Sequence, residues 1–254
     1  MIFLTGFPRS GTSLLATIID RHDKITVTPE TRYFEEIYRG KKIEEKNHLI
    51  NKIYNSKRLK DLNLEFDYLQ KKSDEYLNVF DVFRELMEKY NKKIKTEVVC
   101  EKSPIHSKYM EVLLNEYEDS KFVYIVRDPR ESILSLIKVP WAHNSVIRHS
   151  CEWKYRFNEV NKIIENHSSR VLLIKYEDLM RDPEEIMVKT MDFIGYKFSK
   201  EQLIPKNNTS THSDWEAEWK NNVNRPIIMN NSNKWKTELS MKQIILSEYI
   251  MHDD

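Results

Sequence analysis

The sequence predicts an α/β protein in which a mainly parallel central sheet lies between layers of helices, a three-layer fold. Short apolar runs alternate with segments whose apolar residues recur at helical spacing, which is typical of strands joined by helices. One run, KFVYIV at 121–126, is almost continuously apolar, as expected for a strand buried on both faces of a parallel sheet. The length of 254 residues and the lack of an evident linker predict one domain over 1–254.

The expected strands are 2–5, 25–28, 96–100, 121–126 and 170–177, and the expected helices between and after them are 12–20, 129–138 and 153–166. A further helix is expected to begin after Asp182, an N-cap residue followed by proline and two glutamates, and to end near Gly195. Residues 34–93 predict a helical insertion, or flap, without strong strands. Residues 203–235, rich in asparagine and tryptophan, predict an irregular active-site segment.

Composition excludes several classes of protein. The 41 Lys and Arg residues nearly balance 40 Asp and Glu residues, so the chain is not a polycation built for nucleic acid. It has no apolar run of eighteen residues, and its first residues lack the features of a signal peptide, so we expect no membrane partner. The two cysteines and eight histidines show no metal-ligand spacing. Together these features predict a cytoplasmic protein with reduced thiols and no metal site.

One local charge surplus leaves two interpretations open. Residues 41–60 contain seven Lys or Arg against two Glu. A solvated helical face explains such a segment in most cases. The alternative is a basic flap close to an anionic ligand.

A glycine-bounded loop carries the strongest functional signal. Gly6 and Gly11, two of four glycines in the chain, enclose the loop between the first strand and the first helix, where backbone N–H groups and the helix dipole favour an anion. The spacing resembles the P-loop G-x-x-x-x-G-K-[ST], which makes the expected fold P-loop-like. However, Thr12 occupies the position of the P-loop lysine, and Arg9 supplies a cation from within the loop.

Two motifs together are similar to those of sulfotransferases that use 3′-phosphoadenosine 5′-phosphosulfate (PAPS). PRSGTS at 8–13 resembles the 5′-phosphosulfate loop of that family, which assigns cofactor binding to Arg9, Ser10, Gly11, Thr12 and Ser13. RDPRESILS at 127–135, directly after the 121–126 strand, resembles the 3′-phosphate motif. The resemblance assigns Arg127 and Ser135 to the 3′-phosphate, whereas we expect Arg130 to be a helix-surface charge.

Further segments extend the resemblance. EKSP at 101–104 is similar to the family segment whose lysine, here Lys102, contacts the transferring group. KYEDL at 175–179 resembles a strand–helix junction whose tyrosine, here Tyr176, either reaches the nucleotide or belongs to the core. PETR at 29–32 resembles the ETR segment of tyrosylprotein sulfotransferases, in which the glutamate, here Glu30, is the general base.

The C-terminal part resembles that subfamily less fully. Arg225-Pro226 followed by Lys234-Trp235 is similar to its KP…KW pattern, in which the lysine reaches the cofactor. Around Trp219 there is no serine where the subfamily contributes one. Trp215 and Trp219 are better explained by an apolar stripe than by an acceptor platform.

The resemblance implies an enzyme that transfers a sulfuryl group in line from PAPS to an acceptor hydroxyl or amine and releases PAP. Glu30 is the implied general base, Lys102 and Arg9 are the implied catalytic cations, and no metal is required. The implied partner is a small-molecule or peptide acceptor. For Glu30, the competing interpretation is a surface carboxylate paired with Arg32; Arg32 otherwise positions the base or the acceptor. For His106 we expect a surface or capping role in place of a catalytic one.

Two other functions remain as alternatives. A P-loop kinase or NTPase would need a lysine in place of Thr12 and a carboxylate for Mg²⁺ after a central strand, where Asp128 is the candidate. A non-catalytic nucleotide-binding module would share the fold without turnover. The acceptor and the oligomeric state cannot be read from the sequence.

Overall fold

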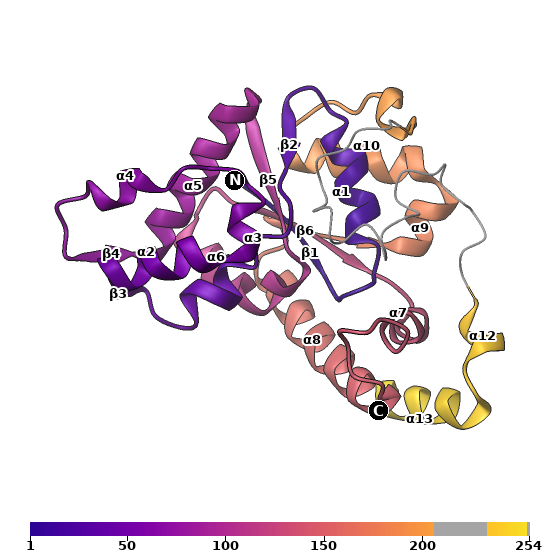
Figure 1. The fold of residues 1–254 in the computed structure, drawn as a ribbon. Helices are drawn as coiled ribbons and strands as arrows, with labels where there is room; N and C mark the ends of the chain where they lie inside the picture. The colour runs from indigo at the N-terminus through magenta and orange to yellow at the C-terminus, as the bar shows by residue number, and fades with distance from the viewer. Residues whose placement is uncertain (206–232, 253–254) are drawn as a thin grey trace.

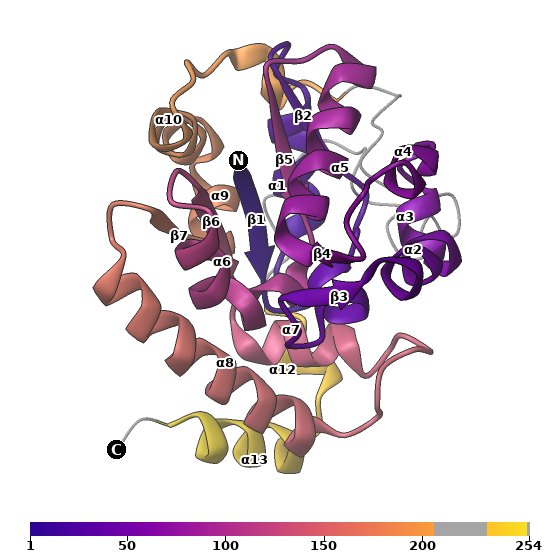
Figure 2. The same ribbon diagram turned by 90° about the vertical axis from the view of Figure 1, so that its left-hand side faces the viewer.

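The computed structural model describes residues 1–205 and 233–252. Five parallel strands form its central sheet in the order β2-β5-β1-β6-β7 (Figure 1; β7 is labelled in Figure 2). The strands are β1 (Ile2–Gly6), β2 (Ile25–Val27), β5 (Val98–Lys102), β6 (Lys121–Val126) and β7 (Val171–Lys175). Because all five run in the same direction, the loops that follow them meet at one edge of the sheet.

Helices cover both faces of this sheet, as Figures 1 and 2 show. One face carries α1 (Thr12–Asp20), α9 (Tyr176–Arg181) and α10 (Pro183–Ile194), whose apolar side chains form a core with Leu4 and Val123. The other face carries α5 (Val79–Ile94), α6 (Met110–Glu116) and α8 (Val146–Asn166), which pack around Phe3 and Phe122. The predicted three-layer α/β fold with a mainly parallel sheet is therefore confirmed.

Shorter elements complete the carboxyl edge and the C-terminal part. The π-helix η1 (Phe34–Tyr38) follows β2, the 3₁₀ helix η2 (Pro104–Tyr109) follows β5, and α7 (Pro129–Leu136) follows β6. A second 3₁₀ helix, η3 (Lys200–Leu203), lies beyond α10. The helix α12 (Trp235–Glu238) packs on α7, and α13 (Met241–Met251) lies along α8 (Figure 2).

Several element boundaries differ from the sequence-based expectation. The strand expected at 96–100 is shifted, so that β5 ends at Lys102 and both Glu101 and Lys102 lie within the sheet. The helix expected from 153 begins at Val146, because Ser145 caps it by accepting a hydrogen bond from the Arg148 N–H. The strand expected to reach 177 ends at Lys175, and Tyr176 begins α9.

The segment 34–93, expected to be a helical insertion without strong strands, is mainly helical but also contains one short strand pair. Besides α2 (Lys46–Asn55), α3 (Lys57–Lys60) and α4 (Asp67–Gln70), it contains an antiparallel pair, β3 (Ile43–Glu45) with β4 (Tyr76–Asn78). Each strand has three residues, and the inward residue of β3 is Glu44, whose carboxylate lies 2.6 Å from Lys52 Nζ. A strand that buries an ion-paired glutamate shows no apolar alternation, so the pattern could not predict it.

The turn from β1 to α1 depends on Gly11. Its φ of 98° lies in the left-handed region, and a Cβ there would lie 2.5 Å from Cδ2 of Tyr176. Gly40 has a comparable φ of 86°, but a Cβ there would meet nothing within 4 Å. Substituting Gly40 therefore introduces backbone strain alone, whereas substituting Gly11 introduces backbone strain together with a steric clash.

We expect Gly40→Ala to lower the free energy of unfolding by about 1 kcal/mol, the cost of the left-handed conformation for alanine. Gly11→Ala should cost about 1–3 kcal/mol more, because the added methyl group also displaces the Tyr176 ring. Urea unfolding of both variants measures the difference. Equal losses would contradict a role for the Tyr176 contact.

Candidate active site

The glycine-bounded loop between β1 and α1, residues 6–11 (the cofactor-type loop), is joined to α7 by direct hydrogen bonds. Arg9 Nε donates to Ser135 Oγ at 2.9 Å, and the hydroxyl oxygens of Ser10 and Ser132 lie 3.4 Å apart. Arg9 itself adopts a left-handed φ of 69°. Two segments that are 120 residues apart in the sequence therefore form one site at the carboxyl edge of β1 and β6.

Two arginines face this site. Burial lowers the pKa of Arg9, the neighbouring positive charge of Arg127 lowers it further, and the Glu30 carboxylate opposes both effects. Arg9, Arg127 and Glu30 are therefore within electrostatic range of one another. Holding two guanidinium groups close together is unfavourable by itself and favours an anion between them.

Arg127 is held by an acid and an aromatic ring. Its Nη2 donates to Glu131 Oε2 at 3.1 Å, and its guanidinium lies 4.4 Å from the centroid of the Tyr176 ring. Tyr176 is buried in the core and also packs against Gly11. Tyr176 therefore belongs to the core, and its contact with a nucleotide stays a prediction.

The C-terminal part attaches to this site through Trp235. The Trp235 backbone N–H donates to Glu131 Oε1 at 3.3 Å, and its ring lies 3.7 Å from the Arg130 guanidinium carbon. Arg130 also contacts Asp128 at 2.7 Å and Glu248 at 2.6 Å, which fits the expected structural charge. Lys234 is exposed beside Trp235, and its contact with a cofactor stays a prediction.

The two residues assigned to catalysis form a buried ion pair. Lys102 Nζ donates to Glu30 Oε1 at 3.1 Å; the Lys102 side chain is 0% exposed and that of Glu30 is 11% exposed. The competing interpretation of Glu30 as a surface carboxylate paired with Arg32 is wrong, and the Lys102 ammonium group is not solvated. Lys102 is the last residue of β5, and Glu30 follows the end of β2. Because these two strands are parallel neighbours, both residues lie at the same edge of the sheet.

A second buried network beneath this pair was not predicted. Glu101 accepts hydrogen bonds from Thr31 Oγ1 at 2.6 Å and from Ser103 Oγ at 2.6 Å, and lies 2.8 Å from His106 Nδ1. His106 Nε2 accepts a hydrogen bond from the Phe34 N–H, so the ring proton is on Nδ1. Nδ1 therefore donates a hydrogen bond to the Glu101 carboxylate. Burial would raise the pKa of Glu101, but His106 and the two hydroxyl groups outweigh it and lower the pKa.

This network corrects the expectation for His106. Its side chain is fully buried, so a surface position is wrong, while its bond to the first N–H of η1 is a capping role. The Arg32 N–H donates to Ser103 Oγ at 3.1 Å, and Arg32 adopts a left-handed φ of 47°. The network therefore fixes the backbone that carries Glu30.

Sequence reasoning also missed Arg58. This residue of α3 places Nη1 3.7 Å from Glu30 Oε2 and Nε 3.6 Å from Glu36 Oε1. The basic surplus at 41–60 was the available signal, but no spacing rule singles out one of its seven cations.

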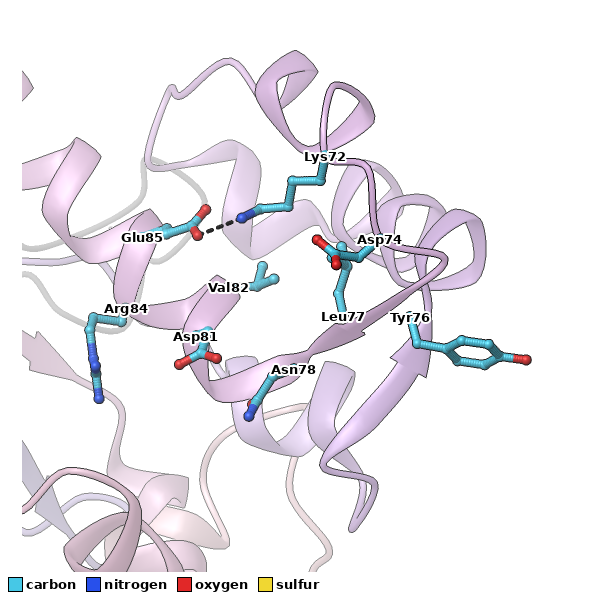
Figure 3. Close-up of a pocket in the computed structure, with 9 residues that line it drawn as sticks. All are labelled: Lys72, Asp74, Tyr76, Leu77, Asn78, Asp81, Val82, Arg84 and Glu85. Carbon is cyan, nitrogen blue, oxygen red and sulfur yellow. Dashed lines mark hydrogen bonds and ion pairs between the residues drawn. The ribbon is translucent and has the colours of Figure 1, made fainter.

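Other candidate sites contribute less. Among residues 1–205 and 233–252, no group of three or more His, Cys, Asp or Glu residues is arranged to hold a metal ion. A pocket between β4 and α5 contains none of the assigned residues; Figure 3 shows Lys72 and Glu85 paired across it at 2.6 Å. Its lining has three acids against two cations, which does not suit a dianion: Asp74, Asp81, Glu85, Lys72 and Arg84.

Some sequence-based assignments cannot be placed. Trp215, Trp219 and Arg225-Pro226 lie outside the described residues, as does most of the segment 203–235. Within the described part of the chain, no helix is both long enough and apolar enough to cross a bilayer.

The fold and the site define an α/β protein with a glycine-bounded loop, two arginines and a buried Lys–Glu pair at the carboxyl edge of its sheet. The model of a sulfotransferase family matches residues 2–200. The chain belongs to this sulfotransferase family, which confirms the resemblance inferred from the motifs.

Named relatives support this family membership. The chain is 22% identical over 246 residues to a protein-tyrosine sulfotransferase of Drosophila melanogaster and 27% identical over 246 residues to protein-tyrosine sulfotransferase 2 of Gallus gallus. The alignments cover 92% of this chain in both cases, but 46% and 62% of the relatives. The chain thus spans roughly half to three fifths of their length.

Solved structures share the fold. The sulfotransferase domain of the olefin synthase from Synechococcus PCC 7002 superposes with a TM-score of 0.70 at 20% identity, covering 100% of this chain and 95% of that one. Mouse sulfotransferase SULT7A1, complexed with PAP, gives 0.54 at 15% identity and covers 98% and 81%.

The Glu101 network yields a prediction about acid stability. The carboxylate has a lowered pKa in the folded protein, so it stabilises the fold above its unfolded value of about 4.5 and loses this effect as pH falls through the folded value. Glu101→Gln should lower the free energy of unfolding by about 3 kcal/mol at pH 7, and this deficit should shrink on acidification.

Urea unfolding from about pH 7 down to about pH 3, below the unfolded pKa, measures both effects. Glu97→Gln is the control, because Glu97 is 56% exposed and pairs with Lys24 at the surface; we expect a change below about 1 kcal/mol. A constant difference between Glu101→Gln and the parent protein at every pH would contradict the linkage.

Proposed function

We propose that this protein is a PAPS-dependent sulfotransferase that moves a sulfuryl group to an acceptor hydroxyl or amine, with Glu30 as the general base. The observation that carries the proposal is the buried Lys102–Glu30 pair at 3.1 Å beside the cofactor-type loop. A carboxylate next to a completely buried ammonium group, at the edge where phosphate-type motifs meet, suits a proton acceptor and a cation for a leaving anion.

The residues present fit such a cofactor. The 5′ end of PAPS carries one phosphate and one sulfate, and the 3′ end carries a further phosphate. The N-terminus of α1 at Gly11 offers backbone N–H groups, and Arg9 and Arg127 are like charges held close enough to depress the pKa of Arg9. Ser135 lies at hydrogen-bonding distance from Arg9. Ser10, Thr12 and Ser13 belong to the same loop and helix start, Tyr176 packs against Gly11, and their contacts with the cofactor stay predictions.

The mechanism assigns a separate task to each residue. The cofactor supplies the sulfuryl group and a phosphate leaving group. Arg9 and Arg127 hold and neutralise the anion, so that the acceptor can approach in line. Lys102 stabilises the charge that develops on the leaving oxygen. Glu30 takes the proton of the acceptor as the new oxygen–sulfur bond forms. These residues supply charge without a metal ion.

The two alternative functions are less well supported. A kinase or NTPase would need a lysine where the buried Thr12 begins α1. It would also need a carboxylate for Mg²⁺, but the candidate Asp128 caps α7 and is paired with Arg130. For a non-catalytic module, a buried charge pair at the edge of the sheet would be costly to retain without a use.

The acceptor class follows from the relatives rather than from the site. Because they are named protein-tyrosine sulfotransferases, a phenolic hydroxyl, in a small molecule or a peptide tyrosine, is the first acceptor to test. A cytoplasmic location stays a prediction, and the oligomeric state stays open.

Calorimetry in EDTA tests the cofactor. PAP should bind without a metal ion, and Arg127→Ala should weaken binding about 10- to 100-fold, the usual effect of losing a charged hydrogen bond. Arg181→Ala, which removes a cation that is 76% exposed on α9, is the control and should bind as the parent does. Absence of PAP binding together with Mg·ATP binding would overturn the proposal in favour of a kinase.

A transfer assay with labelled PAPS and a panel of phenols, alcohols, amines and tyrosine peptides tests the base. Glu30→Gln should reduce the rate about 10²- to 10⁴-fold while PAP binding persists. Glu35→Gln is the matched control, since Glu35 lies five residues further on and bonds to Tyr109. Full activity of Glu30→Gln would exclude Glu30 as the base.

A further inference from the structure

Three lysines of the basic segment 41–60 have partners in the insertion or in α6. Lys42 Nζ lies 2.7 Å from Glu116, Lys52 Nζ lies 2.6 Å from Glu44, and Lys46 Nζ donates to the Lys72 carbonyl at 3.0 Å. None of these three contacts involves Glu30. Arg58 differs, because its guanidinium reaches the site.

Arg58 contacts Glu30 at two points. Its Nη1 lies 3.7 Å from Glu30 Oε2 and donates to the Glu30 carbonyl at 3.5 Å. The Arg58 side chain is 14% exposed and that of Glu30 is 11% exposed, so solvent screens the pair weakly. Lys102 meets the other carboxylate oxygen, Oε1. The two oxygens of Glu30 therefore face two different cations.

Glu36 and Ser56 hold the Arg58 side chain in place. Its Nε lies 3.6 Å from Glu36 Oε1, and Ser56 Oγ donates to Glu36 Oε2 at 3.1 Å. Ser56 also caps α3 by accepting the Leu59 N–H, and Leu59 is completely buried. The chain Ser56–Glu36–Arg58 thus connects the core of the insertion to Glu30.

We propose that Arg58 is a positioning residue that holds Oε2 of Glu30, so that Oε1 is the oxygen that receives the acceptor proton. This inference rests on the proposed function. Oε1 lies on the side of Lys102, which serves the transferring group, whereas Oε2 lies on the side of the insertion. An acceptor oxygen between the base and the sulfur atom therefore meets Oε1.

The proposed transfer moves one proton and exchanges one sulfur–oxygen bond for another. The acceptor O–H proton passes to Glu30 Oε1, the acceptor oxygen forms a bond to sulfur, and the bond from sulfur to the phosphate oxygen breaks. The electron pair of that bond stays on the phosphate oxygen, where Lys102 neutralises it. Arg58 forms no bond to substrate and keeps the carboxylate from rotating.

Among the described residues, cations from different elements act on Glu30: Lys102 of β5 and Arg58 of α3 contact its carboxylate, and Arg9 of the loop after β1 lies within electrostatic range. Glu36 is the acid behind Arg58. Each cation favours the ionised carboxylate. Removing Arg58 leaves Lys102 and Arg9 in place, so Glu30 should still ionise but at a higher pH.

The test is a carboxyl-carbon NMR titration of ¹³C-glutamate-labelled full-length protein with PAP added, in which the signal lost in Glu30→Gln identifies Glu30. Arg58→Gln should raise the titration midpoint of Glu30 by about one pH unit, the lower end of the range for an opposite charge at this distance. Arg58→Lys should restore part of this change, because it keeps the charge and loses the fork.

Lys52→Gln is the matched control, since it breaks an ion pair of the same insertion that does not involve Glu30. It should leave the Glu30 midpoint unchanged, and PAP affinity should be equal in all these variants. In the transfer assay, Arg58→Gln should lower kcat and move the acid limb of the pH profile upward, with the KM for PAPS unchanged.

An unchanged Glu30 midpoint in Arg58→Gln, or an equal change in Lys52→Gln, overturns the inference. The titration needs no acceptor, so it separates this failure from failure of the proposed function, which would appear as absent PAP binding. Full transfer activity of Glu30→Gln would overturn both the assigned base and its positioning.

Discussion

The buried charge of Lys102 constrains the architecture of the whole carboxyl edge. Removing an ammonium group from water costs several kcal/mol unless an acid and further hydrogen bonds compensate it. Glu30 provides the acid at 3.1 Å, and it reaches that position because β2 pairs in parallel with β5. The Glu101–His106 network then fixes the backbone between Glu30 and η1. The position of the proposed base is therefore a consequence of balancing one buried cation.

The opposite side of the site solves the inverse problem, an excess of positive charge. Burial and the positive charge of Arg127 lower the pKa of Arg9, and each arginine is restrained by neutral or acidic neighbours: Ser135 for Arg9, and Glu131 and Tyr176 for Arg127. The same Glu131 binds the backbone of Trp235. Glu131 thus orients Arg127, the residue proposed to bind the 3′-phosphate, and anchors the C-terminal part of the chain.

Local patterns predicted the parts of the fold that depend on continuous apolar sequence. The run at 121–126 predicted β6 to the residue, and the glycine-bounded loop predicted the turn from β1 to α1. The β3–β4 pair escaped prediction because its inward position in β3 is an ion-paired glutamate. The bonds from Thr31 to Glu101 and from Arg58 to Glu30 join residues 70 and 28 positions apart, and no local spacing encodes such contacts. The motif resemblance found the charged pair, but not the groups that position it.

The left-handed backbone of Arg9 has a consequence for the speed and selectivity of ligand capture. A free arginine side chain loses up to about 2 kcal/mol of conformational entropy when it is immobilised. Here the backbone at φ 69° and the bond to Ser135 immobilise Arg9 during folding. An arriving anion therefore meets a rigid, preorganised receptor and need not order it. Such a site discriminates by shape as well as by charge, because an anion that cannot match the fixed guanidinium gains little from approaching it.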